Sequence, residues 1–257
     1  MSQSDKSRHF ASLHIPGAPL ELYNIWDAGS ARAIAGEGAK ALATGSAGVA
    51  AAQGYGDGEQ IPLGFVLQLV ERIVASVPDL PVSVDFEGGY AKAPQDLGPN
   101  IAAVIGAGAV GINFEDQIVG GAGLYSTEDQ AARIRAVRQA ASKAEEDFFI
   151  NARTDLFLKS DPATHAAHLP EALARAQSYA EAGASGFFVP GLTDPALIEK
   201  ICKGTRLPVN VLVSPSAPPT DVLAECGVAR LSHGPFPYRA LMRSLAEGYA
   251  KMVANRG

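Results

Sequence analysis

The chain has 257 residues, of which 47% are hydrophobic and 19% are charged, and its formal net charge is −6. This length and composition exclude a disordered chain, so the sequence predicts one folded domain, residues 1–257, with a flexible segment at residues 1–12. Because no basic run is present, we expect no nucleic-acid partner.

The sequence contains neither a predicted membrane helix nor a cysteine pattern typical of disulfides or redox sites. No stretch approaches the roughly 18 apolar residues of a membrane helix, and the first ten residues are polar. We therefore expect a cytoplasmic protein that does not contact membranes. The two cysteines, Cys202 and Cys226, are isolated in helix-like segments, which predicts two buried, unreactive thiols without a disulfide.

Short apolar runs alternate with helical stretches along the whole chain. Eight runs are typical of buried parallel strands, namely Leu20–Trp26, Ala39–Thr44, Pro81–Phe86, Val110–Glu115, Asp147–Arg153, Ser185–Pro190, Pro208–Val213 and Val228–His233. Helical periodicity lies between them, at Leu63–Val77, Thr127–Lys143, Glu171–Ala182, Pro195–Cys202 and Pro219–Glu225. Eight parallel strands in a chain of this length predict an α/β protein with a (β/α)8 TIM-type barrel.

A GxGxxG string at Gly106–Gly111 matches the dinucleotide-binding pattern by sequence alone. Its context differs, because it ends a predicted helix and enters a strand. The phosphate-binding version leaves a strand and opens a helix. The string therefore predicts a helix cap and a turn.

The last predicted helix, Phe236–Val253, has an apolar stripe formed by Leu241, Leu245, Tyr249 and Met252. A stripe of this width packs against another surface. It covers either the barrel itself or a neighbouring subunit.

Acidic residues gather where the third and fourth strands end, in VDFEGG and INFEDQ. Side chains alternate along a strand, so we expect Asp85, Glu87 and Glu115 to face the barrel axis. Each pair would repel by about 3 kcal/mol at ~5 Å and an effective dielectric near 20, which makes burial without a cation unfavourable. Oxygen ligands favour Mg²⁺, with Mn²⁺ as an alternative. A solvated acidic rim is the other interpretation.

Four motifs at consecutive strand ends resemble those of the isocitrate lyase and phosphoenolpyruvate mutase superfamily. They are TGSAGVAAAQGYGDGE from Thr44, VDFEGGYA from Val84, GINFEDQ from Gly111 and NARTD from Asn151. The similarity extends from NIWDAGSAR at Asn24 through the eighth strand. This resemblance implies Mg²⁺-dependent chemistry on a small carboxylate through an enolate-like species. It also implies a homo-oligomer, a tetramer or a dimer, in which the last helix is exchanged between neighbours.

The resemblance further implies a role for each site residue. Asp85 would be the direct metal ligand, and the metal-bound waters would be held by Glu87, Glu115 and Asp57. The substrate would contact backbone N–H groups of Gly45, Ser46 and Ala47, together with the side chains of Arg153 and Asn210.

The loop after the fourth strand departs from the family pattern. Between Gln117 and Thr127 it reads QIVGGAGLYST, without Cys, Lys or His. It thus lacks the Lys-Lys/Arg-Cys-Gly-His signature of the isocitrate and methylisocitrate lyases, and also the Lys and Asn of the phosphonopyruvate mutases. Its glycines permit a hinged lid, in which Tyr125 is the side chain able to act as an acid. The alternative is a packed tyrosine.

Three functions remain open from the sequence. The leading hypothesis is a Mg²⁺-dependent lyase or decarboxylase that cleaves a carbon–carbon bond of a 2-oxo or 2-hydroxy acid, with Arg153, Glu115 and Tyr125 as catalytic residues. Phosphonopyruvate mutase or hydrolase chemistry is the second. A non-catalytic protein that binds a 2-oxo acid is the third.

Overall fold

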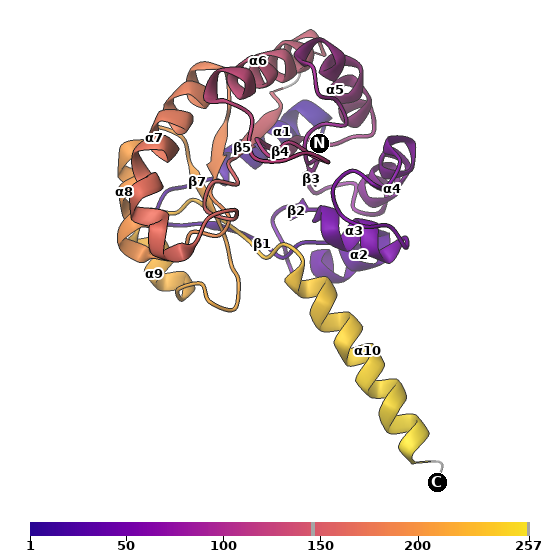
Figure 1. Ribbon diagram of the computed structural model, residues 1–257. Helices are drawn as coiled ribbons and strands as arrows, with labels where there is room; N and C mark the ends of the chain where they lie inside the picture. Colours follow the sequence, from indigo (N-terminus) through magenta and orange to yellow (C-terminus); the bar gives the residue numbers. More distant parts are fainter. Residues whose placement is uncertain (145–146, 256–257) are drawn as a thin grey trace.

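The computed structural model describes residues 1–144 and 147–255. Its eight strands are parallel and follow the order β1-β8-β7-β6-β5-β4-β3-β2. A parallel bridge between Ile25 and Thr44 joins the two edges of this sheet, and helices surround it (Figure 1). The predicted (β/α)8 barrel is confirmed.

Each predicted strand is present, although the paired strand is shorter than the predicted run. The strands are β1 Leu20–Leu22, β2 Leu42–Ala43, β3 Val82–Asp85, β4 Gly111–Glu115, β5 Phe149–Arg153, β6 Gly186–Phe188, β7 Val209–Leu212 and β8 Arg230–Ser232. The α-helices are α1 Gln3–Ser12, α2 Ala28–Gly36, α3 Ser46–Ala52, α4 Leu63–Ser76, α5 Leu97–Gly106, α6 Thr127–Lys143, α7 His165–Glu181, α8 Pro195–Gly204, α9 Thr220–Glu225 and α10 Phe236–Ala254. Two short 3₁₀ turns are η1 Pro94–Asp96 and η2 Pro162–Thr164.

Alternation along the strands separates two environments. Outward-facing residues such as Phe86, Phe114 and Ile150 are fully buried in the main apolar core, which also contains residues of the surrounding helices. Polar residues occupy part of the barrel interior. Asn151 Nδ2 donates to Asn113 Oδ1 at 2.9 Å and to Asn210 Oδ1 at 3.0 Å. These bonds satisfy buried amides that would otherwise be costly to bury.

Within the segment 1–12, which we expected to be flexible, residues 3–12 form α1. The Ser2 hydroxyl and the Asp5 carboxylate cap its first turn reciprocally, which is a capping box. Phe10 is fully buried against Phe149, with ring centroids 5.4 Å apart. A polar sequence with a single anchoring phenylalanine therefore packs onto the barrel.

The GxGxxG string serves as the predicted cap and turn. α5 ends at Gly106, and β4 begins at Gly111. Gly108 between them has a φ of +95°, a conformation that glycine adopts without steric cost. The segment enters a strand instead of opening a helix, which is the wrong geometry for binding a pyrophosphate.

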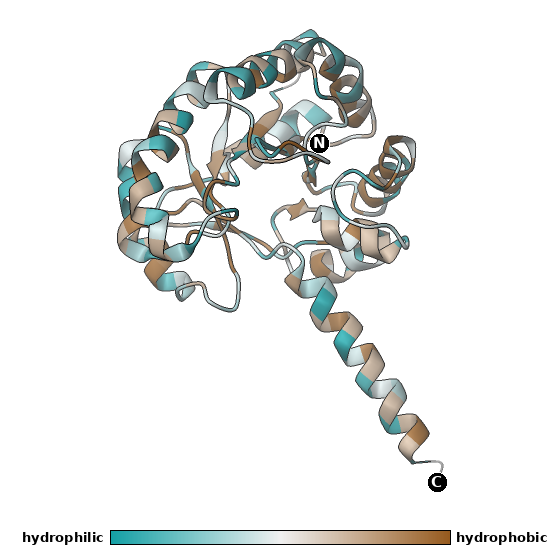
Figure 2. Cartoon of the chain, in the orientation of Figure 1, coloured by the Kyte–Doolittle hydropathy of each residue, from teal (hydrophilic) through white to brown (hydrophobic). Residues whose placement is uncertain are grey.

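Helix α10 extends away from the barrel (Figure 1), and hydrophobic residues recur along it (Figure 2). Leu241, Leu245 and Tyr249 are 51%, 66% and 67% exposed. The stripe therefore does not cover its own barrel, which removes one of the two alternatives. No helix within residues 1–144 and 147–255 is long and apolar enough to cross a membrane.

The two cysteines carry free thiols, as expected, but they are only partly buried. Burial raises the pKa of Cys202 to about 12, and the nearby Cys226 thiol adds to the shift. A thiol with such a pKa holds almost no reactive thiolate at neutral pH.

The buried His14 predicts a pH dependence of stability. Burial and then Arg230 lower its pKa to about 3, against 6.5 for a free histidine. The unfolded chain therefore binds more protons between about pH 3 and 6.5, and stability is lost as the pH falls through that window. We expect this histidine to remove about 2 kcal/mol of unfolding free energy between pH 6.5 and 5.

Urea unfolding at both pH values tests this expectation. His14→Gln should reduce the difference between the two unfolding free energies by about that amount. His9→Gln changes an exposed histidine of α1, five residues before His14, so it should leave the difference as in the wild type. An unchanged pH dependence in His14→Gln would contradict the assignment.

Candidate functional site

A cavity of about 300 Å³ opens at the C-terminal ends of the strands, where (β/α)8 barrels carry their active sites. Its polar wall comes from the ends of β1 to β5 and from the loop after α3, and consists of Asn24, Gly45, Ser46, Ala47, Asp57, Asp85, Asn113 and Arg153. Six of the sequence-predicted site residues are in this set. The others, Glu87, Glu115, Tyr125 and Asn210, are not on this wall.

Asp85 is the last residue of β3 and is held from two sides. Its Oδ2 accepts hydrogen bonds from Ser46 N–H at 3.1 Å and from the Ser46 hydroxyl at 3.0 Å. Its Oδ1 accepts only a long bond of 3.4 Å, from Asn113 Nδ2. The carboxylate is thus oriented while Oδ1 keeps a lone pair toward the cavity.

Asp57 reaches the same cavity from the loop after α3. Burial raises its pKa and the neighbouring Asp85 raises it further, although the Ser46 hydroxyl opposes the shift. Two carboxylates, Asp57 and Asp85, therefore share this end of the cavity, and the charge of Asp85 disfavours the ionised form of Asp57.

Glu87 does not line the cavity. It follows the end of β3, so strand alternation does not determine the direction of its side chain. β3 ends at Asp85, and Glu87 has a φ of +50°, which is unusual for a residue with a side chain. Glu87 borders a small hollow that Asp85 also lines. Burial raises its pKa to about 8, and Asp85 and Asp57 add to the shift.

Glu59 stabilises the left-handed conformation of Glu87. We did not identify Glu59 as a site residue from the sequence. The Glu59 N–H donates to Glu87 Oε2 at 3.0 Å, and the Glu59 carboxylate accepts the Tyr90 N–H at 2.8 Å. Both Glu59 and Tyr90 have positive φ angles. Strained residues on two adjoining loops are often part of a functional site, and Glu59 already stood in the GYGDGE motif.

Arg153 is clamped between two carboxylates. The register of the sheet pairs it with Glu115, and its Nη1 lies 3.0 Å from Glu115 Oε2. Its Nε and Nη2 donate to Asp155 at 2.5 and 2.8 Å. Burial alone would lower its pKa, but Glu115 and Asp155 raise it above the ordinary range.

Glu115 itself is deeply buried. Burial raises its pKa well above the ordinary value, against the opposing effect of Arg153. Arg153 thus forms ion pairs with Glu115 and Asp155, whereas among the described residues no cation lies within 4.0 Å of the carboxylate of Asp57, Asp85 or Glu87.

The acids do not form a set of direct metal ligands. Within residues 1–144 and 147–255, no three His, Cys, Asp or Glu side chains are grouped so that they could hold a metal ion. The assignment of Asp85 as the direct metal ligand, with the other acids holding metal-bound waters, stays a prediction. The geometry leaves Asp85 as the acid with an oxygen open to the cavity.

Fewer backbone N–H groups are free to bind a substrate carboxylate than the resemblance implies for Gly45, Ser46 and Ala47. The Gly45 N–H donates to Ile25 O at 3.1 Å, and the Ser46 N–H is taken by Asp85. Among the described residues, only the N–H of Ala47 is left without an acceptor in this group of three.

Asn210 does not reach the cavity. It is fully buried and donates to Arg230 O at 3.0 Å, while its Oδ1 accepts the Ser232 hydroxyl at 3.2 Å. Ser232 lines the cavity in its place. Alternation correctly predicted that Asn210 points inward, but not how deep it lies.

Tyr125 also lies away from the cavity. Its ring is stacked on Arg133, whose guanidinium carbon is 4.3 Å from the ring centroid. The Tyr125 N–H donates to Asp116 O at 2.8 Å, and Arg175 donates to its carbonyl at 3.1 Å. This placement matches the alternative of a packed tyrosine.

The cavity has further wall residues that the sequence analysis did not assign. Asn24 accepts the Gly234 N–H at 2.7 Å and thereby links the ends of β1 and β8. Phe236 and Arg239 come from the first turn of α10. Asn24 opened the NIWDAGSAR motif and followed a strand, so alternation could have found it, whereas nothing in the pattern pointed to Arg239.

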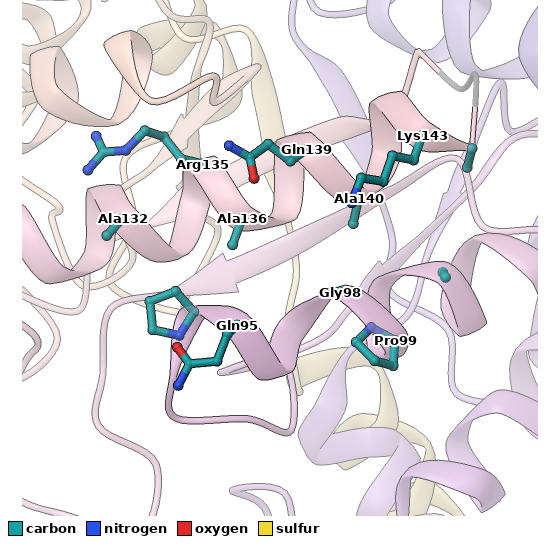
Figure 3. A pocket seen from close by; sticks show the side chains of 12 residues that line it. Gln95, Gly98, Pro99, Ala132, Arg135, Ala136, Gln139, Ala140 and Lys143 are labelled. Atoms are coloured by element: carbon teal, nitrogen blue, oxygen red, sulfur yellow. The ribbon is translucent and has the colours of Figure 1, made fainter.

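A larger hollow of about 770 Å³ lies on the outer surface, between α5 and α6 (Figure 3). Small residues such as Gly98, Ala132 and Ala136 line it, with Arg135 and Lys143 at the side. None of the described residues around it is acidic, and it is not at the strand ends. It is therefore a gap between two helices with small side chains, not the candidate site.

Comparison with known proteins places the chain among enzymes of one family. The family model described as phosphoenolpyruvate phosphomutase matches residues 10–253. The 2-methylisocitrate lyase of Escherichia coli is 30% identical, over 93% of this chain and 84% of that protein.

Solved structures share the fold. A Burkholderia cenocepacia protein with a provisional assignment as a phosphonomutase is 49% identical, with a TM-score of 0.94 over the full length of both chains. A phosphonopyruvate hydrolase in complex with oxalate and Mg²⁺ has a TM-score of 0.85 at 20% identity, over 98% of this chain and 88% of that one.

Proposed function

The chain belongs to the phosphoenolpyruvate phosphomutase family, and from that premise we propose that it is a Mg²⁺-dependent lyase or decarboxylase. Its substrate would be a small 2-oxo or 2-hydroxy acid, cleaved at a carbon–carbon bond to leave an enolate-like fragment. The observation that carries the proposal is the group of carboxylates at and beside the cavity, of which Asp57, Asp85 and Glu87 form no ion pair with a described cation.

The donor set fits a hard divalent cation. Asp57, Asp85, Glu87 and Glu115 offer only oxygen, which favours Mg²⁺ and allows Mn²⁺. Asp85 would bind the ion directly through its open Oδ1, and the other three acids would hold its waters. When bound, Mg²⁺ supplies a Lewis acid for the substrate's oxygen and balances the local negative charge.

Arg153 would orient the substrate. Glu115 and Asp155 hold three of its nitrogens, so its plane is fixed before a substrate arrives. A guanidinium has five N–H bonds, and those not facing the two carboxylates are left for a substrate oxygen. Such a preorganised donor stabilises negative charge that develops on that oxygen.

The remaining polar wall would bind the acid end of the substrate. The free N–H of Ala47 and the amide of Asn113 lie on the same wall as Asp85. Tyr125 is left out of the proposed catalytic set because its ring contacts Arg133. The exposed glycines of the loop after β4 would allow that loop to move over the cavity and exclude water.

Phosphorus–carbon chemistry on phosphonopyruvate is a second candidate. The 49% identity to a protein with a phosphonomutase assignment favours it. Both reactions pass through a pyruvate-like enolate, so they would use the same acids and the same arginine. A non-catalytic 2-oxo acid binding protein, the third hypothesis, has no comparable support, because the relatives named above are described as a lyase, a phosphonomutase and a hydrolase.

The metal proposal predicts the effect of removing Asp85. NMR would follow oxaloacetate, phosphonopyruvate, 2-methylisocitrate and 2,3-dimethylmalate with the protein in Mg²⁺ and then in EDTA. We expect one substrate to be converted in Mg²⁺ only, and Asp85→Ala to slow that conversion at least about a hundredfold with the circular dichroism spectrum unchanged.

Asp79→Ala is the matched control, because Asp79 is exposed and lies between α4 and β3, away from the cavity. It should convert the same substrate at the wild-type rate. Near-normal turnover by Asp85→Ala, or turnover that persists in EDTA, would rule out the metal mechanism.

We also propose that the protein is a homo-oligomer, a dimer or a tetramer, held together by α10. Leu241, Leu245 and Tyr249 are exposed along one stripe of this extended helix, and exposed apolar stripes mark interaction surfaces. The occupant of this face would be a second copy of the chain, in line with the helix exchange that the family resemblance implies.

Leu245→Glu tests this assembly, since Leu245 is 66% exposed at the centre of the stripe. We expect the variant to dissociate into monomers at micromolar concentration in analytical ultracentrifugation, because a buried charge would disfavour the interface. Glu247→Gln, on the other side of the helix, should keep the wild-type mass. A wild-type protein that is already monomeric would refute the assembly.

A further inference from the structure

Asp116 is a buried acid that the proposed mechanism does not use. It directly follows the end of β4, its side chain is fully shielded from solvent, and it is outside the cavity wall. Burying a carboxylate is costly unless it is paired and hydrogen-bonded. The bonds that Asp116 forms therefore indicate what an acid contributes at this position.

Two bonds join Asp116 to the segment that carries Arg153. The Asp116 N–H donates to Arg153 O at 3.0 Å, and Asp116 Oδ1 accepts the Asp155 N–H at 3.0 Å. The Asp155 carboxylate in turn accepts the bonds from Nε and Nη2 of Arg153. Asp116 thus holds the backbone at Arg153 and again at Asp155, whose side chain fixes the guanidinium.

The second oxygen of Asp116 is held from the outer layer of helices. Its Oδ2 accepts the Tyr179 hydroxyl at 2.8 Å and Nη1 of Arg175 at 3.0 Å. Both donors belong to α7 (Figure 1), where Arg175 also pairs with Glu171 at 2.8 Å. Helix α7 is thereby connected through Asp116 to the ends of β4 and β5.

Only a carboxylate can form the bonds on both sides of this connection. The Asp155 N–H donates to one oxygen, and Tyr179 and Arg175 donate to the other. An amide of the same shape has one acceptor oxygen, and its NH₂ group only donates. An asparagine would therefore leave the donors of one side without an acceptor.

We propose that Asp116 is a positioning residue that sets the plane of the Arg153 guanidinium through Asp155, with Arg175 and Tyr179 holding Asp116 in place. This inference rests on the proposed function, in which Arg153 donates to the substrate's oxygen. Rotation of the guanidinium would misalign its N–H bonds with that oxygen, and hydrogen bonds weaken as they leave linearity. An acid behind the cavity wall thus orients the arginine on it.

Isothermal titration calorimetry of the full-length protein with Mg²⁺ and then with oxalate tests this role. Oxalate is a planar dianion similar in size to a pyruvate enolate, so it would occupy the place proposed for the substrate's oxygens. We expect Asp116→Asn to weaken oxalate binding about tenfold, as the loss of one charge-assisted bond would. Its affinity for Mg²⁺ should change less than twofold, because other residues hold Asp85 in position.

Glu171→Gln is the matched control, because it removes the other carboxylate partner of Arg175 and leaves Asp116 in place. It should bind oxalate with the wild-type affinity. Arg153→Lys provides a second background, since lysine keeps the charge but lacks the planar fork. If Asp116 acts through Arg153, adding Asp116→Asn to that background should weaken oxalate by less than a further factor of about two.

Tyr179→Phe is a milder variant that tests the same connection if Asp116→Asn does not fold. It removes one donor to Asp116 Oδ2 and leaves the charge of the ion pair unchanged. We expect it to weaken oxalate about threefold, as the loss of one neutral hydrogen bond in the connection would, and to leave Mg²⁺ affinity at the wild-type value.

The outcomes separate this inference from the proposed function. Wild-type oxalate affinity in Asp116→Asn or in Tyr179→Phe would overturn the inference, and so would a tenfold loss that persists in the Arg153→Lys background. Equal losses of Mg²⁺ and oxalate affinity would make Asp116 a general support of the barrel and would also overturn it. If the wild type binds no oxalate in Mg²⁺, the proposed site is wrong, and the inference falls with it.

Discussion

The carboxylates at one end of the barrel impose the condition to which the rest of the site responds. Asp85 raises the pKa of both Asp57 and Glu87, and Arg153 pairs with Glu115 and Asp155. Buried like charges are costly. A protein retains such an arrangement when a cation or a substrate balances it, which is why these acids carry the functional proposal.

Hydrogen bonds below and beside the carboxylates hold them in position. Asn113 contacts Asp85 above and accepts bonds from Asn151 and Arg230 below, so the carboxylate that lines the cavity rests on a buried polar network. Beside it, Glu59 ties the loop after α3 to the loop after β3. Rigid support of this kind fixes ligands to within fractions of an ångström, as a catalytic site requires.

Sequence reasoning succeeded where regular structure determines the geometry. Apolar runs located all eight strands, and alternation correctly turned Asp85 and Arg153 inward. It failed where the chain leaves regular structure: Glu87 follows the end of β3 in a left-handed conformation, so alternation could not place it. Alternation also does not show how deep an inward-facing side chain lies along the barrel axis, which is why Asn210 was expected in the cavity. The contact of Tyr125 with Arg133 and the position of Arg239 depend on tertiary packing, which no local pattern encodes.

The most direct test of the acid cluster is calorimetric titration of Mg²⁺ into the metal-free protein, with Ca²⁺-free buffer and no substrate. If the cluster is a cation site, one Mg²⁺ per chain binds saturably, and the melting temperature rises with Mg²⁺ concentration as linkage requires. Titration without saturable heat, together with a melting temperature that Mg²⁺ does not change, would contradict the account.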